Sequence, residues 1–145
     1  MVNWITDMLG TAPYGTVTES KNIKVVDVRS MVDRGGNSKE SILEIIQEAR
    51  EYLLYKISVV VCCDHGISRS NSIVAGVICT EEKCSFSVAV QKVLNTTKIV
   101  GIRPDVLNDV RAAIGECGID GTNSNLLITG GSGMVGKTMA DIIAN

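Results

Sequence analysis

A cysteine and an arginine separated by five residues constrain this chain more than any other feature. Residues 57–62 are rich in β-branched side chains and predict a buried strand, and residues 72–79 predict a buried helix. Cys63 follows the strand, and Arg69 stands at the start of the helix. The sequence therefore predicts a strand, a short loop and a helix, with a thiol at the end of the strand.

This loop has the composition of a phosphate-binding site. Its backbone N–H groups can turn inward as an anion-binding nest, and the following helix adds the positive end of its dipole. Arg69 offers a planar fork of donors for two phosphate oxygens. The same positive field favours Cys63 as a thiolate, the nucleophilic form. We predict that the phosphate-binding residues are Asp64, His65, Gly66, Ile67, Ser68 and Arg69.

The alternative is that Cys63 is an inert core residue, since cysteine is among the most buried residue types. A bare pair of Cys and Arg at this spacing arises by chance. The preceding strand, the turn at Gly66, the Ser-Arg-Ser run and the following helix together favour the phosphate-binding interpretation.

Cys63, Arg69 and Ser70 match the Cys-x5-Arg-Ser/Thr signature of the dual-specificity branch of the protein tyrosine phosphatases, which the chain resembles. Further similarity lies in residues 5–10, 22–29, 85–90 and 102–106, so residues 1–118 are expected to form one phosphatase-like domain. The resemblance implies an α/β fold with a central, mostly parallel sheet flanked by helices. It also implies a phosphate monoester hydrolase that uses no metal and no cofactor.

In the resembled family, the cysteine attacks phosphorus and forms a phosphocysteine, the arginine holds the phosphate, and the Ser/Thr hydroxyl donates to the sulfur. These roles would belong to Cys63, Arg69 and Ser70. The chain departs from the family at Cys62, where the family usually has a histidine that orients the loop and helps to hold the thiolate.

A carboxylic acid elsewhere must protonate the leaving oxygen. In the resembled family it is an aspartate on a loop roughly thirty residues before the nucleophile. Asp33 has this spacing and lies in a glycine-containing loop, whereas Asp27 lies within a predicted strand. We predict Asp33 as the general acid because loops carry catalytic residues more often than strand interiors, and Asp27 remains the alternative.

Two other functions also fit residues 1–118. A rhodanese-type sulfurtransferase would share residues 25–29 and a cysteine-containing loop with Arg-Ser, although its usual Gly-His-Ile-x-Gly-Ala stretch is absent. A phosphate-binding regulatory module without turnover would be consistent with Cys62 in place of histidine.

Composition limits the partners. The chain has 145 residues and a formal net charge of −2, without a block of basic residues, so nucleic acid is not an expected partner. It contains no apolar run of membrane-spanning length. Five cysteines, an odd number, favour a reducing cytoplasm over a disulfide framework. Expected substrates are a phosphorylated protein or a small phosphorylated metabolite, a sugar phosphate included; the oligomeric state is not predicted.

The pattern along residues 1–118 alternates strands and helices. Strands are expected at 2–6 and at 23–28, the second in the centre of the sheet because it is apolar on both faces. A capping box of Ser41 and Glu44 predicts the start of a helix. Ser85 is expected to cap another, and Pro104 to begin the last. The pattern favours helices on both faces of the sheet.

The last residues do not fit the phosphatase pattern. Residues 119–125 have the composition of a linker, and residues 126–145 predict a strand, a glycine turn and the start of a helix. The turn contains Gly130, Gly133 and Gly136, and resembles the dinucleotide fingerprint of nucleotide-sugar epimerases of the extended short-chain dehydrogenases. A Walker A pattern from Gly131 to Thr138 overlaps it. We expect a truncated fusion, with an incomplete cofactor site and NADP bound only by the full-length fusion.

Overall fold

The computed structural model describes residues 2–65, 67–99 and 102–115. Its elements in chain order are β1 (Asn3–Trp4), β2 (Leu9–Pro13), β3 (Ile23–Asp27), α1 (Lys39–Leu54), β4 (Ser58–Cys63), α2 (Ser68–Glu82), α3 (Phe86–Thr97) and α4 (Pro104–Ile114). The predictions for Gly66, for the linker at 119–125 and for the glycine turn at 126–145 lie outside the described residues and stay predictions.

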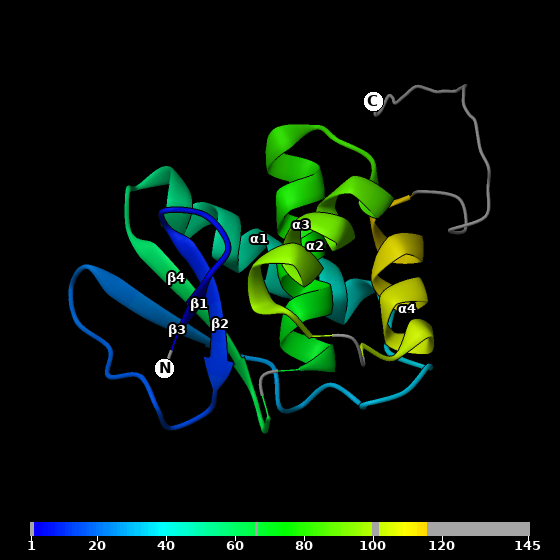
Figure 1. Cartoon of the computed structure of the whole chain (residues 1–145), viewed down its shortest axis with the longest axis horizontal. Coiled ribbons are helices and arrows are strands. Elements are labelled where there is room, and N and C mark those ends of the chain that lie inside the picture. The colour runs from blue at the N-terminus through cyan, green and yellow to red at the C-terminus, as the bar shows by residue number, and fades with distance from the viewer. Residues whose placement is uncertain (1, 66, 100–101, 116–145) are drawn as a thin grey trace. The chain divides into compact units, whose positions relative to one another are not determined.

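The strands form one mixed sheet in the order β1-β2-β4-β3, in which β4 is parallel to both of its neighbours and β1 is antiparallel to β2 (Figure 1). The predicted α/β class with a mostly parallel sheet is therefore confirmed. The prediction that residues 23–28 are central is wrong, because β3 is an edge of the described sheet. Its outer side is capped in part by Glu19, whose carboxylate accepts a hydrogen bond from the Val25 N–H.

Strand β2 was missed by the sequence analysis although it pairs with β4 along its whole length. Its sequence, Leu-Gly-Thr-Ala-Pro, has little β propensity, because Gly and Pro are depleted in strands. Gly10 is required there for packing: a Cβ at this position would lie 2.8 Å from Val2 Cγ1 and 2.9 Å from the Asn3 carbonyl oxygen. The glycine that suggests a turn thus allows β1 to lie close against β2.

The main core lies between the sheet and the four helices. Alternate residues of β4, Val59, Val61 and Cys63, share one buried cluster with side chains of all four helices. The other face of the sheet carries a smaller cluster around Val60 and Cys62, to which no described helix contributes. The expectation that helices cover both faces is therefore wrong for the described part of the chain, where all four lie on one side (Figure 1).

Side-chain caps define two of the helices. Ser85 caps α3 as predicted, since its hydroxyl accepts a hydrogen bond from the Val88 N–H. Helix α1 begins earlier than the expected capping box at Ser41, because Ser38 is the N-cap and accepts from the Ser41 N–H. Helix α2 also begins earlier, at Ser68, so its first turn forms part of the loop that follows Cys63.

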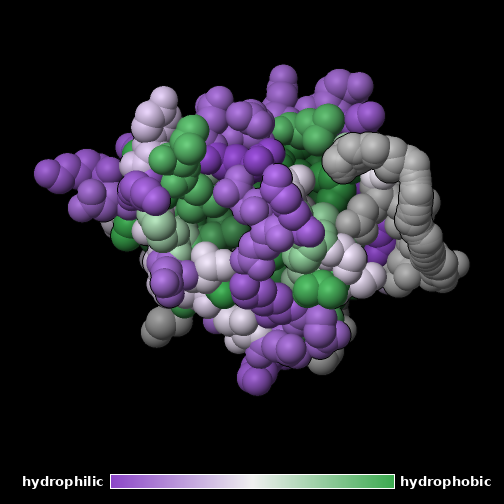
Figure 2. Space-filling model, turned by 90° about the horizontal axis from the view of Figure 1, so that it is seen from above, coloured by the Kyte–Doolittle hydropathy of each residue, from purple (hydrophilic) through white to green (hydrophobic). Residues whose placement is uncertain are grey.

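Few large hydrophobic side chains are strongly exposed. Leu54 and Tyr55, at the end of α1, are each 74% exposed. Seen from above, the hydrophobic surface forms separate patches divided by hydrophilic side chains (Figure 2). Within the described ranges, the helices are too short or too polar to cross a membrane.

Candidate active site

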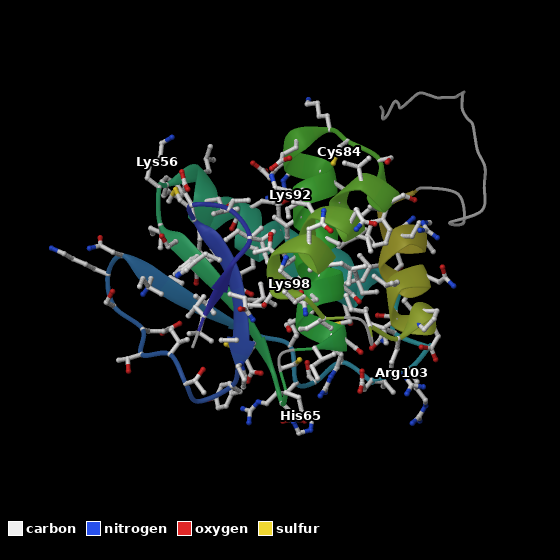
Figure 3. The ribbon with its side chains drawn as sticks, in the orientation of Figure 1. Lys56, His65, Cys84, Lys92, Lys98 and Arg103 are labelled. Atoms are coloured by element: carbon white, nitrogen blue, oxygen red, sulfur yellow. The ribbon has the colours of Figure 1, made fainter. Side chains whose placement is uncertain are left out.

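A pocket of about 250 Å³ opens where β4 ends and α2 begins, at the carboxyl end of the central strand. Its lining residues are Asp33, Cys63, His65, Ile67, Ser68, Arg69 and Arg103. His65 and Arg103 both lie toward the lower end of the molecule, whereas Cys84 lies at the opposite end (Figure 3). Ligands of open α/β sheets bind at this edge, so the fold places these residues where a ligand site is expected.

Arg69 is held in place by the main chain. It is only 8% exposed, and its Nη1 donates to the carbonyl oxygens of Arg29 and Met31, each at 3.1 Å. On the other edge of the guanidinium, Nη2 donates to the Asp64 carboxylate at 3.1 Å. The buried Nε has no hydrogen-bond partner among the described residues. Main-chain carbonyl groups thus anchor Nη1, whereas on the other edge Nη2 pairs with Asp64 and Nε is left for an anion to accept from.

Cys63 and Ser70 form a buried pair at the base of the site. The Cys63 thiol donates to Ser70 Oγ at 3.4 Å, and Ser70 is fully buried in the first turn of α2. Cys62 points to the opposite face of the sheet, as strand alternation requires. Burial, with the charges of Asp27 and Cys63, raises the pKa of the Cys62 thiol to about 11. Cys62 is therefore a neutral packing residue at physiological pH.

The two candidate acids occupy different surroundings. Asp33 lines the pocket, and its carboxylate lies 4.0 Å from Arg69 Nε. Asp27, the last residue of β3, pairs instead with Arg29 at 2.9 Å, and this pairing lowers the pKa of Asp27. The Arg29 guanidinium also stacks 3.4 Å from the centre of the Tyr14 ring. The structure thus brings Asp33, and not Asp27, into the pocket with Cys63.

Of the other predicted loop residues that the structure describes, His65, Ile67 and Ser68 line the pocket, whereas Asp64 does not. Asp64 and His65 are exposed, and Ile67 immediately precedes α2. Ser68, the first residue of α2, is buried and accepts a hydrogen bond from the Arg103 N–H. The start of this helix adjoins the pocket, and the positive end of its dipole favours negative charge there.

Two pocket features were not predicted. Arg103 was noted only as part of a family-like segment, yet it lines the pocket from the start of α4 with its side chain half exposed. The Asp64 carboxylate was not expected to pair with Arg69, since only the backbone of Asp64 was considered. Both contacts depend on the folded loop, and no local sequence signal predicts them.

Nothing in the described ranges gathers three potential metal ligands. The glycines predicted to bind a dinucleotide, Gly130, Gly133 and Gly136, lie beyond these ranges.

Comparison with known proteins gives structural matches alone. No protein-family model matches the sequence, and no curated protein matches it. Among solved structures, human DUSP28 in a variant form has a TM-score of 0.68 and 10% identity, covering 78% of this chain and 93% of that chain. A mouse putative dual specificity phosphatase complexed with zinc tungstate has a TM-score of 0.68 and 12% identity, covering 77% and 85%.

A third neighbour is the human tyrosine phosphatase-like serine/threonine/tyrosine-interacting protein, with a TM-score of 0.64 and 14% identity, covering 77% of this chain and 93% of that chain. At such low identities a match shows the fold and not the activity. The described part of the chain has the fold of the dual-specificity and tyrosine phosphatases.

Proposed function

We propose that the chain is a cysteine-dependent phosphatase that hydrolyses phosphate monoesters through a phosphocysteine on Cys63. The observation that carries this proposal is the state of Arg69. Its buried Nε has no hydrogen-bond partner among the described residues and lines the same pocket as Cys63. A buried donor without a partner is costly, and a phosphate oxygen placed above Cys63 would satisfy it.

The first chemical step would transfer the phosphoryl group to sulfur. The Cys63 thiolate attacks phosphorus, an S–P bond forms, and the P–O bond to the leaving group breaks. Asp33 gives its proton to the departing oxygen, so that an alcohol leaves instead of an alkoxide. Arg69, the loop N–H groups and the start of α2 stabilise the charge on the phosphoryl oxygens.

The second step would release inorganic phosphate. Water attacks the phosphocysteine, its proton passes to the Asp33 carboxylate, and the P–S bond breaks. Ser70 lies 3.4 Å from the sulfur, so its hydroxyl can donate to the departing thiolate. This is the role that the signature Ser/Thr has in the resembled family, and it does not depend on the residue at position 62.

The proposed substrates are a phosphorylated protein or a small phosphorylated metabolite. Among the described residues, the pocket lining contains no Phe, Tyr or Trp, so both kinds of substrate are proposed. Arg103 and His65 at its lining favour substrates with further negative charge near the phosphate. Tungstate, present in the mouse neighbour, is a tetrahedral oxyanion like phosphate, and the same ion would serve as a probe here.

One alternative also has an observation in its favour. The fold is shared with a protein whose name includes both "phosphatase-like" and "interacting", and Asp64 already pairs with Arg69. A phosphate-binding module without turnover would keep the nest and Arg69 but not the reaction.

Hydrolysis of p-nitrophenyl phosphate, measured beside thiosulfate–cyanide sulfur transfer and vanadate binding, tests the proposal. We expect phosphate release that vanadate inhibits, and no thiocyanate. Vanadate binding without hydrolysis would establish the binding module instead, and thiocyanate formation would establish a sulfurtransferase.

A further inference from the structure

The loop that carries Asp33 is held at both ends by contacts from distant parts of the chain. We name residues 28–38, between β3 and α1, the acid loop. At its first end, Arg69 Nη1 donates to two carbonyl groups, those of Arg29 and Met31. The residue that would bind phosphate therefore also fixes the main chain just before Asp33.

The second end of the acid loop is organised by one side chain, that of Asn37. Its Oδ1 accepts from the Val32 N–H at 2.8 Å, and its Nδ2 donates to the carbonyl oxygens of Val32 and Arg34, each at 2.9 Å. Val32 and Arg34 are the two neighbours of Asp33. Asn37 thus fixes the main chain on both sides of the proposed general acid.

Helix α4 in turn holds Asn37. Asp109 accepts two hydrogen bonds from Asn37, from its N–H at 3.0 Å and from Nδ2 at 3.1 Å. Asp105, one turn earlier on the same helix, accepts from the Gly35 N–H at 3.1 Å. Partial desolvation acts to raise the pKa of Asp105, but the Gly35 hydrogen bond and the Arg103 charge lower it overall. Two carboxylates of α4 therefore bind the acid loop.

The position of the Asp33 side chain depends on these hydrogen bonds to the acid loop. Its side chain is 50% exposed, and its carboxylate lies 4.0 Å from Arg69 Nε, which is beyond hydrogen-bond distance. The position of the carboxylate is therefore set mainly by the main chain of the acid loop. Proton transfer requires the Asp33 carboxyl group to come within about 2.6–3.2 Å of the leaving oxygen. The hydrogen bonds that hold the acid loop therefore decide whether Asp33 can act.

We propose that Asn37 and Asp109 are positioning residues, which hold the acid loop so that Asp33 reaches the leaving oxygen of the substrate. This inference rests on the proposed phosphatase function, with Asp33 as its general acid. Neither residue lines the pocket, so both would act through Asp33.

The test compares substrates that differ in their need for an acid. Asn37→Ala and Asp109→Asn are measured on phenyl phosphate, a poor leaving group, and on 2,4-dinitrophenyl phosphate, whose phenolate leaves without a proton. We expect kcat/KM, which reports the transfer of the phosphoryl group to Cys63 and not the later hydrolysis, to fall about 10- to 100-fold on phenyl phosphate, the scale of general-acid catalysis with a misplaced acid. On the activated ester it should fall less than about 2-fold, since no acid is needed for that leaving group. The fall of kcat/KM on phenyl phosphate at high pH, which reports the deprotonation of the general acid, should also become smaller in these variants.

Matched controls come from exposed contacts elsewhere. Asn95→Ala removes the amide that pairs with Gln91 on α3, and Glu81→Gln removes the carboxylate that pairs with Arg50. Both variants should leave the ratio of the kcat/KM values for the two substrates unchanged. If Asn37→Ala does not fold, Asp109→Asn, which keeps the shape of the side chain, carries the test alone.

A double-mutant cycle separates this inference from the function on which it rests. Adding Asn37→Ala to Asp33→Asn should cost nothing further on phenyl phosphate, because the acid is already absent. Equal losses on both substrates, or a further loss in the double variant, would overturn the positioning role. No hydrolysis by the wild type, or no leaving-group dependence of Asp33→Asn, would instead overturn the proposed function.

Discussion

Arg69 Nη2 donates to the Asp64 carboxylate at 3.1 Å, on the same edge of the guanidinium as Nε, which has no hydrogen-bond partner among the described residues. A phosphate group bound side-on would use both nitrogens, so it must displace Asp64. The residue that follows the proposed nucleophile therefore competes with substrate for the phosphate-binding arginine.

Removing this competitor should strengthen oxyanion binding. The Asp64 side chain is 57% exposed, so its ion pair with Arg69 contributes only about 0–1 kcal/mol. Loss of that pair and of the repulsion between two anions should tighten vanadate binding about 3- to 10-fold in Asp64→Asn. Vanadate inhibition constants of the two proteins measure this. An unchanged or weaker affinity would show that Asp64 does not oppose the ligand.

Cys63→Ser should abolish hydrolysis while vanadate still binds, because Arg69 and the loop N–H groups remain. The matched control is Cys62→Ala, which alters the neighbouring thiol on the opposite face of the sheet and should keep most of the activity. Steady-state hydrolysis of p-nitrophenyl phosphate decides between them. Loss of activity in Cys62→Ala at a temperature where the variant is folded would contradict this assignment of the nucleophile.

Asp33→Asn should lower kcat about 10²- to 10⁴-fold on phenyl phosphate, the range of general-acid catalysis. Asp27→Asn should have little effect on either substrate, because Asp27 pairs with Arg29 away from the pocket lining. The ratio of kcat/KM for phenyl phosphate to kcat/KM for 2,4-dinitrophenyl phosphate measures the effect. A larger change of that ratio in Asp27→Asn than in Asp33→Asn would move the acid to Asp27.

The raised pKa of the Cys62 thiol predicts that the folded protein loses stability at high pH. Its folded pKa of about 11 exceeds the ordinary value of 9.0, so between these pH values the folded state holds a proton that the unfolded state has lost. The resulting stabilisation is complete below pH 9.0 and disappears as the pH rises through 11. As the pH rises from below 9.0 to above 11, the free energy of unfolding should therefore fall by about 3 kcal/mol more in the wild type than in Cys62→Ala.

Urea unfolding of both proteins at pH 8 and above measures this difference, and the Cys62→Ala variant removes the contribution of lysines and tyrosines that titrate in the same range. If the free energy of unfolding falls equally with pH in the wild type and in Cys62→Ala, the pKa of Cys62 is not raised by folding.

The local part of the site could be predicted because it is contiguous in sequence. One short segment contains the strand before Cys63, the helix after it and the spacing to Arg69. The strand and the helix each have a recognisable hydrophobic pattern. The Cys63–Ser70 contact follows from the same segment. The spacing that the family resemblance implies, with the preference for a loop over a strand, also led to Asp33, which lines the pocket.

The remaining features depend on contacts between distant segments, which a single sequence does not reveal. Strand β2 contains a glycine because β1 packs against it, so local propensity indicated a turn. The apolar run in β3 suggested a central strand, although β3 lies at the edge of the described sheet. Arg103, Asn37 and Asp109 acquire their roles only when α4 lies beside the pocket and the acid loop.

The central claim is a covalent phosphoryl group on Cys63, and rapid acid quenching during turnover of p-nitrophenyl phosphate tests it most directly. The phosphocysteine would form in the wild type and be trapped by denaturation before water attacks it. Mass spectrometry of the digested protein should then find one added phosphoryl group on the peptide that contains Cys63, and none on that peptide from Cys63→Ser. Turnover that proceeds in the wild type with no phosphorylated cysteine, or with the phosphoryl group on another residue, would contradict the account.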